Sequence, residues 1–409
     1  MAIGAAWLAS SRPTPQPCRS TESIGSKAGS SKPPRRKNLY TAAVCCYLSG
    51  MAIRKDTIAH RLEAVRRAMR ARGIGRLVLT SEANVSYLTG FAGSDSWALI
   101  TGRKSYLLTD SRYTEQAGKE CPVCSIVERT GSLAELVGKL ASGAAARPAV
   151  EDGVSVAAFA AIRRCVGARP RAVGGLVEQI RRTKDRSEIG MIRASAALAA
   201  DALAQTLAKV RTGMTEGELA GLLDLEMRRR GATTSFETIV AFGANGSRPH
   251  HRPGRRKLRA NDTILIDFGA RLNGYCSDMT RCFAVGKASR EWARAFDVVE
   301  RAQAAAMAAI ADGVRVEQVD AAARRVIADS GLPVYGHGTG HGIGLEIHET
   351  PFIKPGTDEV LRAGDVVTVE PGVYVPGRMG IRIEDDVLVT ADGCRLLTGG
   401  CGHRPNRIG

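Results

Sequence analysis

The chain has 409 residues, 44% of them hydrophobic, so it is long enough for two domains with sizeable cores. Its net charge of +17 is typical of nucleic-acid-binding proteins, but residues 1–50 alone hold seven lysines and arginines against one glutamate. The remaining positive charge raises nonspecific affinity for polyanions without indicating a nucleic-acid function. No apolar run reaches the ~18 residues of a membrane-spanning helix, and the ten cysteines lack the spacing of a disulfide framework. We therefore expect a soluble, cytoplasmic protein.

Residues 1–50 are rich in serine, arginine and proline and poor in acids, which is typical of a disordered basic extension or of a targeting segment. A basic stretch of ~37 residues is too long for the n-region of a signal peptide. Met51 opens a sequence typical of a domain start, so a start codon assigned too early is a further explanation. We favour the extension or the early start over targeting.

Residues 51–180 are predicted to form a small α/β domain. Apolar residues recur at helical spacing over residues 57–72, at Ile58, Leu62, Val65 and Met69, before Gly73. The strand-like stretches "RLVLTS", "WALIT" and "KSYLLTD" follow. Cys121 and Cys124 have the spacing of half a zinc site or of a redox pair, but no second pair accompanies them. We interpret these two cysteines as structural.

Residues 186–400 are predicted to form the second domain. Its first helix is capped by Asp185 or Ser187, and Thr215 with Glu218 forms the capping box of the next helix. Strands follow, and then the order of helix, helix and strands repeats, with helices over residues 290–311 and 316–330. Two halves of roughly 100 residues each favour an internally duplicated α/β domain with a site between the halves.

A predicted hairpin brings two aspartates together. Asn273-Gly274 favours a two-residue type I′ turn, which places Asp267 opposite Thr280 and Asp278 opposite Gly269. The two aspartates are then diagonal neighbours on one face, with backbones about 7–8 Å apart. An unpaired aspartate among apolar strand residues costs several kcal/mol, so each needs a cation, a strong donor or a proton.

Glu370 ends the strand "VVTVE", and Glu384 lies on the same strand face as Arg382. These acids, with histidines on the glycine-rich stretch "GHGTGHGIGLEIHE" (336–349), suit Mn²⁺, Co²⁺, Zn²⁺ or Fe²⁺ better than a thiolate-bound structural zinc. Four carboxylates can hold two metals about 3.5–4 Å apart, which activate a water. The alternative is that Arg281 and Arg382 pair with the acids. Pairing four buried acids in this way costs more desolvation than a metal site.

Several motifs resemble the creatinase/aminopeptidase P/prolidase family of pita-bread metallopeptidases. They are "LIDFGARLNGYCSDMTR", "GTGHGIGLEIHE", "TVEPGVYVPGRMGIRIEDDVLVT" and, more weakly, "SRPHHRP". Residues 51–180, which include "TDSRYTEQA", resemble the smaller N-terminal domain of that family. The resemblance implies an α/β (α+β) fold, a pita-bread catalytic domain with internal pseudo-duplication after a creatinase-like N-terminal domain.

The resemblance also implies the roles of individual residues. Two divalent ions, with Mn²⁺ expected first, would be held by Asp267, Asp278, His341, Glu370 and Glu384, with Asp278 or Glu384 bridging. His250 and His348 would line the substrate site and donate to the developing oxyanion, and Glu370 would act as general base and then acid. Arg382 would orient a metal ligand or meet a substrate carboxylate.

Two histidine assignments stay open. His251 follows His250 directly, so either imidazole could face the site. His337 has the i, i+4 spacing of a helical zinc motif with His341, but the intervening "GTG" is a poor helix and no glutamate follows His337. We expect His337 either to bind substrate in the pocket or to pack within its loop.

The resemblance implies hydrolysis of the bond before proline at a peptide N-terminus. We predict an Xaa-Pro aminopeptidase, with an Xaa-Pro dipeptidase (prolidase) as the alternative and a homodimer by family resemblance. A non-catalytic binding module and a metal-free creatinase-type enzyme are disfavoured by the complete ligand set, and a methionine aminopeptidase by residues 51–180. The basic run after His251 is interpreted as a solvated loop rather than a nucleic-acid patch, because no aromatic residues interleave with it.

Overall fold

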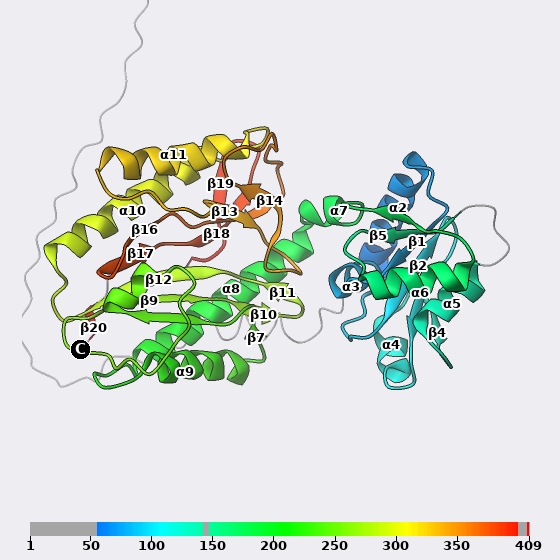
Figure 1. Ribbon diagram of the computed structural model, residues 1–409, viewed down its shortest axis with the longest axis horizontal. Helices are drawn as coiled ribbons and strands as arrows, with labels where there is room; N and C mark the ends of the chain where they lie inside the picture. The colour runs from blue at the N-terminus through cyan, green and yellow to red at the C-terminus, as the bar shows by residue number, and fades with distance from the viewer. Residues whose placement is uncertain (1–54, 142–146, 400–406, 409) are drawn as a thin grey trace, which may run out of the picture. The chain divides into compact units, whose positions relative to one another are not determined.

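The computed structural model describes residues 55–141, 147–399 and 407–408 (Figure 1). The predictions for residues 1–50 lie outside these described residues. Within the described ranges, every helix is too short or too polar to traverse a lipid bilayer.

The N-terminal segment is built around a six-stranded mixed sheet with the order β4-β3-β2-β1-β5-β6. Its strands are β1 (Arg76–Leu79), β2 (Trp97–Thr101), β3 (Ser105–Thr109), β4 (Ser125–Glu128), β5 (Ala149–Glu151) and β6 (Arg171–Val173). Its helices are α2 (Lys55–Ala71), α3 (Glu82–Thr89), α4 (Thr114–Glu120), α5 (Leu133–Ala141), α6 (Val156–Val166) and α7 (Glu178–Arg182). The predicted helix and the three predicted strands are all present.

Strand alternation gives this sheet two apolar faces. Leu77 and Leu79 of β1 share a core cluster with the apolar residues predicted for α2, which are all buried. Val78, between them, belongs to a second cluster with residues of α5 and α6. The segment is therefore a three-layer α/β/α arrangement.

Cys121 and Cys124 fit the structural interpretation. Both are free thiols, as are the other four cysteines among the described residues. Burial raises the pKa of the Cys121 thiol to about 12 and also raises the pKa of Cys124. Both thiols are therefore poor nucleophiles at neutral pH.

The C-terminal segment contains two halves of similar order. The first half consists of α8 (Arg186–Leu207), α9 (Glu216–Arg229), β7 (Thr233–Thr234), β8 (Ile239–Phe242), the 3₁₀ helix η1 (Gly243–Ser247), β9 (Thr263–Phe268), β10 (Ala270–Leu272), β11 (Tyr275–Cys276) and β12 (Met279–Val285). The second consists of α10 (Arg290–Ala308), α11 (Val316–Asp329), β13 (Gly340–Gly342), β14 (Glu349–Ile353), β15 (Val366–Val369), β16 (Gly372–Val375), β17 (Met379–Arg382), β18 (Asp385–Val389) and β19 (Cys394–Leu396). A last strand, β20 (Arg407–Ile408), pairs with β12.

The helix starts follow the predicted capping. Asp185 accepts hydrogen bonds from the backbone amides of Ser187 and Glu188, so the cap of α8 is Asp185 rather than Ser187. Thr215 and Glu218 form the predicted capping box of α9. Helices α8 and α9 cover the strands of the first half and α10 and α11 those of the second, with the strands between the two helix pairs (Figure 1).

The predicted hairpin register is confirmed along most of its length. Thr280 is opposite Asp267 and Tyr275 is opposite Leu272, across a turn in which Asn273 and Gly274 both have positive φ. The predicted pair of Asp278 with Gly269 falls in an interruption of the ladder between β11 and β12, and the predicted register holds on both sides of it, with Cys276 opposite Arg271 and Met279 opposite Phe268. A Cβ at Gly269 would lie 1.9 Å from the carbonyl oxygen of Ser277, so the two strands approach there too closely for any other residue.

Candidate active site

The candidate metal ligands come from both halves of the C-terminal segment. The first half supplies Asp267 in β9 and Asp278 immediately before β12. The second supplies His341 in β13, Glu370 immediately after β15, and Glu384 between β17 and β18. An isolated bridge between Thr280 and Glu384 joins the two halves at this point, so the acids converge where the halves meet.

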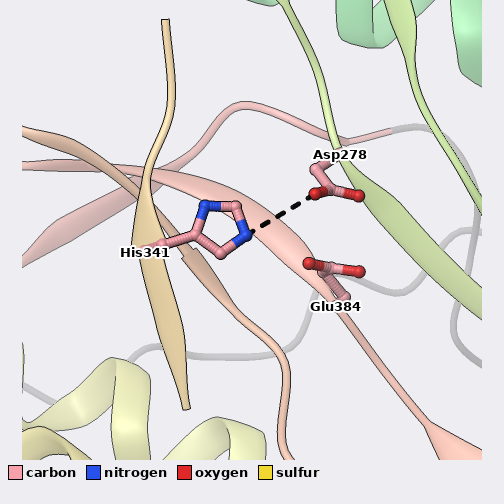
Figure 2. Close-up of side chains that lie close together, drawn as sticks. All are labelled: Asp278, His341 and Glu384. Carbon is pink, nitrogen blue, oxygen red and sulfur yellow. Dashed lines mark ion pairs between the residues drawn. The ribbon is translucent and has the colours of Figure 1, made fainter. Parts of the chain in front are cut away.

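Three of these side chains form a tight cluster. Ligand atoms of Asp278, His341 and Glu384 all lie within 4.8 Å of one another, and all three residues are buried. Figure 2 shows the imidazole directed at the two carboxylates. The Nε2 atom of His341 is 3.7 Å from Asp278 Oδ2 and 3.7 Å from Glu370 Oε1. Four of the five predicted ligands therefore surround one point.

The imidazole of His341 has the orientation and the protonation state of a metal ligand. Its Nδ1 donates to the carbonyl oxygen of Gly342 at 3.0 Å, which leaves the lone pair of Nε2 directed at the acids. Burial lowers the pKa of His341 to about 4, so the ring is neutral at pH 7. A neutral imidazole with one nitrogen fixed by a backbone carbonyl is the usual form of a histidine ligand.

Within the described residues, the candidate carboxylates lack some of the hydrogen bonds and opposite charges that buried acids require, and a bound cation would supply them. Oδ1 of Asp267 and Oδ1 of Asp278 are buried and have no hydrogen-bond partner within the described part of the chain. Burial and neighbouring carboxylates raise the pKa of Asp278 and of Glu384 well above their usual values. Burial also raises the pKa of Glu370 to about 8, despite the nearby Arg382. Bound divalent cations would offset both the desolvation and the mutual repulsion.

Arg382 orients two of the candidate metal ligands, Asp267 and Glu384. Its Nη2 donates to Asp267 Oδ2 at 2.6 Å, its Nη1 to the Tyr374 hydroxyl at 2.8 Å and its Nε to Thr280 Oγ1 at 3.0 Å. Thr280 in turn donates to Glu384 Oε2 at 2.6 Å. Arg382 thus holds one acid directly and a second through a hydroxyl.

The alternative in which arginines neutralise all four acids is not supported among the described residues. Asp267 alone has an arginine partner there. Arg281 instead bonds Asp385 at 2.7 Å and the carbonyl oxygen of Glu384 at 2.6 Å. It supports the backbone beneath the site, and the Glu384 carboxylate accepts from Thr280 instead.

The structure distinguishes the histidines. His250 is exposed, whereas His251 is buried and its Nε2 lies 2.9 Å from Glu216 Oε2. The ring of His348 packs edge-on against His341, with centroids 4.4 Å apart. His337 bonds the Gly338 carbonyl through Nδ1 at 2.7 Å and the Tyr374 hydroxyl through Nε2 at 3.0 Å, so it is packed in its loop as well as lining the pocket.

Every site residue predicted from the sequence lines one cavity of roughly 470 Å³. The nine residues are His250, Asp267, Asp278, His337, His341, His348, Glu370, Arg382 and Glu384. Phe236, Ile239 and Ile347 add an apolar wall, and Arg252 lies at the same cavity. Metal ligands, hydrogen-bond donors and an apolar surface therefore meet in one space, which is the composition of a small-molecule or peptide site.

Sequence reasoning missed Tyr374 and Glu216. Tyr374 lies in an alternating strand that gives no sign of the hydroxyl contacts made in the fold. Glu216 stands between Thr215 and Glu218 at the start of a helix, where an acid is ordinary. Only the tertiary structure brings Tyr374 into contact with His337 and Arg382, and Glu216 into contact with His251.

Comparison with known proteins agrees with this geometry. Residues 190–391 match metallopeptidase family M24, and residues 61–183 match the creatinase/prolidase N-terminal domain. The uncharacterized peptidase YqhT of Bacillus subtilis is 36% identical over 353 residues, which are 85% of this chain and 99% of that protein.

Two solved structures share the fold over most of their length. An Xaa-Pro dipeptidase from Bacillus anthracis aligns with a TM-score of 0.82 and 35% identity, over 86% of this chain and 99% of that one. An X-Pro aminopeptidase from Thermotoga maritima aligns with a TM-score of 0.77 and 35% identity, over 84% of this chain and 100% of that one. The pita-bread fold and the enzyme class expected from the sequence are confirmed, and the chain belongs to metallopeptidase family M24.

Proposed function

We propose that the protein is an Xaa-Pro aminopeptidase, which releases the first residue of a peptide whose second residue is proline. The observation that carries the proposal is the single cavity that contains all nine predicted site residues beside an apolar wall. The likeness to an Xaa-Pro dipeptidase and to an X-Pro aminopeptidase supports this substrate class. The proposal includes domains at residues 51–180 and 186–400, a homodimer, and a cytoplasmic location, which the free cysteines support.

Two divalent ions would be held by Asp267, Asp278, His341, Glu370 and Glu384. Four oxygen donors and one imidazole suit Mn²⁺, with Co²⁺, Zn²⁺ and Fe²⁺ as alternatives. Bound ions of this kind activate water near neutral pH and stabilise negative charge on a carbonyl oxygen. The unpaired Oδ1 atoms of Asp267 and Asp278 support this assignment.

Glu370 is the proposed general base and acid. Its side chain lies at the cavity, and its Oε1 is 3.7 Å from His341 Nε2. We propose that it takes a proton from the attacking water and delivers it to the proline nitrogen. An amide nitrogen leaves as an amine only when it is protonated, and the nitrogen of the Xaa-Pro amide becomes the secondary amine of proline in this step.

His250 and His348 are the proposed donors to the substrate. Both line the cavity, and burial lowers the pKa of His348, which favours a neutral ring with one N–H to donate. A donor placed at the carbonyl oxygen stabilises the tetrahedral state more than the ground state. His337 completes the wall, and the apolar side chains Phe236, Ile239 and Ile347 suit the proline ring.

The state of Arg382 favours an aminopeptidase over a dipeptidase. A dipeptidase must bind the carboxylate of its proline, and Arg382 was one candidate. All three of its nitrogens already donate to protein groups, and the residue is only 3% exposed. In a dipeptidase, Arg252, which lines the cavity, would bind the proline carboxylate instead. The likeness to the Xaa-Pro dipeptidase of Bacillus anthracis supports this alternative.

Steady-state kinetics on Gly-Pro and Gly-Pro-Pro test the proposal. With Mn²⁺, the protein is expected to hydrolyse the tripeptide with a kcat/KM at least about tenfold above that for the dipeptide, because the nitrogens of the buried Arg382 already donate to protein groups and do not serve the proline carboxylate of the shorter substrate. The reverse preference would establish the dipeptidase alternative. Loss of turnover in Asp278→Ala and in His341→Ala links the activity to the proposed metal site.

A further inference from the structure

The carboxylate of Glu216, the first residue of α9, accepts four hydrogen bonds. Its side chain is 1% exposed. Oε1 accepts from the Phe242 amide at 2.9 Å and from Asn245 Nδ2 at 2.7 Å. Oε2 accepts from His251 Nε2 at 2.9 Å and from the Gly254 amide at 3.1 Å. Both oxygens are therefore fully used by donors.

These donors bracket the segment that carries His250. Phe242 and Asn245 lie before His250 in the chain, and His251 and Gly254 lie after it. The amide of Gly217 also donates to the carbonyl of Gly254 at 3.1 Å, which ties the end of the segment to the start of α9. One buried carboxylate thus fixes both ends of a 13-residue stretch, residues 242–254, that contributes His250 to the cavity.

The opposite side of this segment is also fixed. A Cβ at Gly380 of β17 would lie 1.7 Å from the carbonyl oxygen of Gly246, so η1 and β17 touch backbone to backbone. Strand β17 also carries Arg382. The segment therefore has little freedom to compensate for the loss of Glu216.

The charge of Glu216 matters to this arrangement. Burial alone would raise its pKa, but hydrogen bonds from His251, Asn245 and backbone amides outweigh burial and hold its pKa below the usual value. The ionised group accepts at every position and donates at none. Its place at the N-terminus of α9 favours the negative charge further.

We propose that Glu216 is a positioning residue for peptide hydrolysis, and that it acts by holding His250, through His251 and the segment ends, at the substrate. This inference rests on the proposed function. Four donors converge on one anion, and one of them is the buried imidazole of His251, which lines the cavity next to the exposed His250.

Glu216→Gln tests the proposal, because the side chain keeps its size but one oxygen becomes an N–H donor that opposes two other donors. We expect kcat/KM for Gly-Pro-Pro to fall about 10- to 100-fold, since small displacements of a substrate-contacting group have effects of this size. The Mn²⁺ affinity should stay within about twofold of wild type, because Glu216 contacts none of the proposed ligands.

A double-mutant cycle with His250→Ala distinguishes positioning from a general structural role. If Glu216 acts through His250, the double variant loses no more activity than His250→Ala alone. His251→Ala, a milder change that removes one of the four donors, should show the same lack of additivity if Glu216→Gln folds poorly. Additive losses, or an unchanged kcat/KM in Glu216→Gln, would overturn the proposal.

Glu226→Gln is the matched control. Glu226 is also a buried acid of α9, but its partners are Lys209, Arg229 and Arg230. This variant should lose stability and keep its kcat/KM. Wild-type turnover in the same assay distinguishes the two proposals: turnover with an unaffected Glu216→Gln overturns the positioning role alone, whereas no wild-type turnover overturns the proposed function and this inference with it.

Discussion

The guanidinium of Arg382 lies 2.6 Å from the carboxylate of Asp267, and both side chains line the same cavity. Arg382 also reaches Glu384 through Thr280, which accepts from the arginine and donates to the acid. The guanidinium of Arg382 therefore orients two proposed metal ligands, one from each half of the C-terminal segment. This relationship explains how acids on separate strands keep a common geometry.

Arg382→Lys is expected to weaken Mn²⁺ binding by about 10- to 100-fold, because a lysine cannot reproduce the three directed contacts and second-layer partners have effects of this size. Isothermal titration of the metal-free protein measures the change. Arg378→Lys is the control: Arg378 is exposed and pairs with Glu291. Equal Mn²⁺ affinity in Arg382→Lys and wild type would show that metal binding does not require the three hydrogen bonds of the Arg382 guanidinium.

Tyr374→Phe should reduce kcat/KM by about tenfold. Because Nδ1 of His337 donates to a carbonyl, its Nε2 accepts from the Tyr374 hydroxyl, whose oxygen accepts from Arg382. Loss of the hydroxyl leaves an N–H of the buried Arg382 and a nitrogen of the half-buried His337 without this partner, at a cost of about 1–3 kcal/mol for a fully buried group and less for His337.

Tyr335→Phe provides the comparison for this variant. The hydroxyl of Tyr335 is buried and bonds Thr339 at 2.6 Å, whereas the hydrogen bonds of Arg382 within the described residues go to Thr280, Tyr374 and Asp267. Both variants should unfold more easily in urea, and Tyr374→Phe should have the larger effect on kcat/KM. Equal effects on activity would mean that the Tyr374 hydroxyl serves stability only.

Glu349 makes stability depend on acid pH. It bonds Arg181 at 2.5 Å and Lys184 at 3.1 Å. Burial opposes its charge, but Lys184 and Arg181 outweigh burial and lower the pKa of Glu349 to about 2. Because the folded pKa lies below the unfolded value of about 4.3, the contribution is complete above pH ~4.3 and is lost as the pH falls toward 2.

Glu349→Gln should therefore cost about 3 kcal/mol in the free energy of unfolding at pH 7, and the difference from wild type should shrink between about pH 4 and pH 2. Urea unfolding at several pH values measures it. Glu346→Gln is the control, because Glu346 also contacts Arg181 but its side chain is 48% exposed, which limits its effect to about 1 kcal/mol. If the difference in the free energy of unfolding between Glu349→Gln and wild type did not change with pH, the ion pairs of Glu349 with Arg181 and Lys184 would not explain it.

Metal addition is expected to stabilise the fold. Ligands that bind only the folded state raise the free energy of unfolding by about 2.7 kcal/mol at 100 times their Kd. Thermal unfolding of chelator-treated protein should shift upward with Mn²⁺, and the shift should disappear in His341→Ala, which removes the imidazole of the cluster. An equal shift in that variant would place the stabilising metal elsewhere.

Much of the fold and site could be predicted from local sequence signals. The Asn273-Gly274 turn sets the register that places Asp267 opposite Thr280, and Thr215 with Glu218 marks a helix start. The contacts of Tyr374 and Glu216 could not be predicted, since each depends on partners brought close only by packing. The interrupted ladder at Gly269 likewise follows from a close approach of two strands.

Product analysis of Gly-Pro-Pro incubated with the Mn²⁺-loaded protein tests the central claim most directly. The account predicts free glycine and Pro-Pro in equal amounts, and no products with Asp278→Ala or with chelator-treated protein. Cleavage that persists in Asp278→Ala, or an intact tripeptide together with an untouched panel of Xaa-Pro peptides under full metal loading, would contradict it.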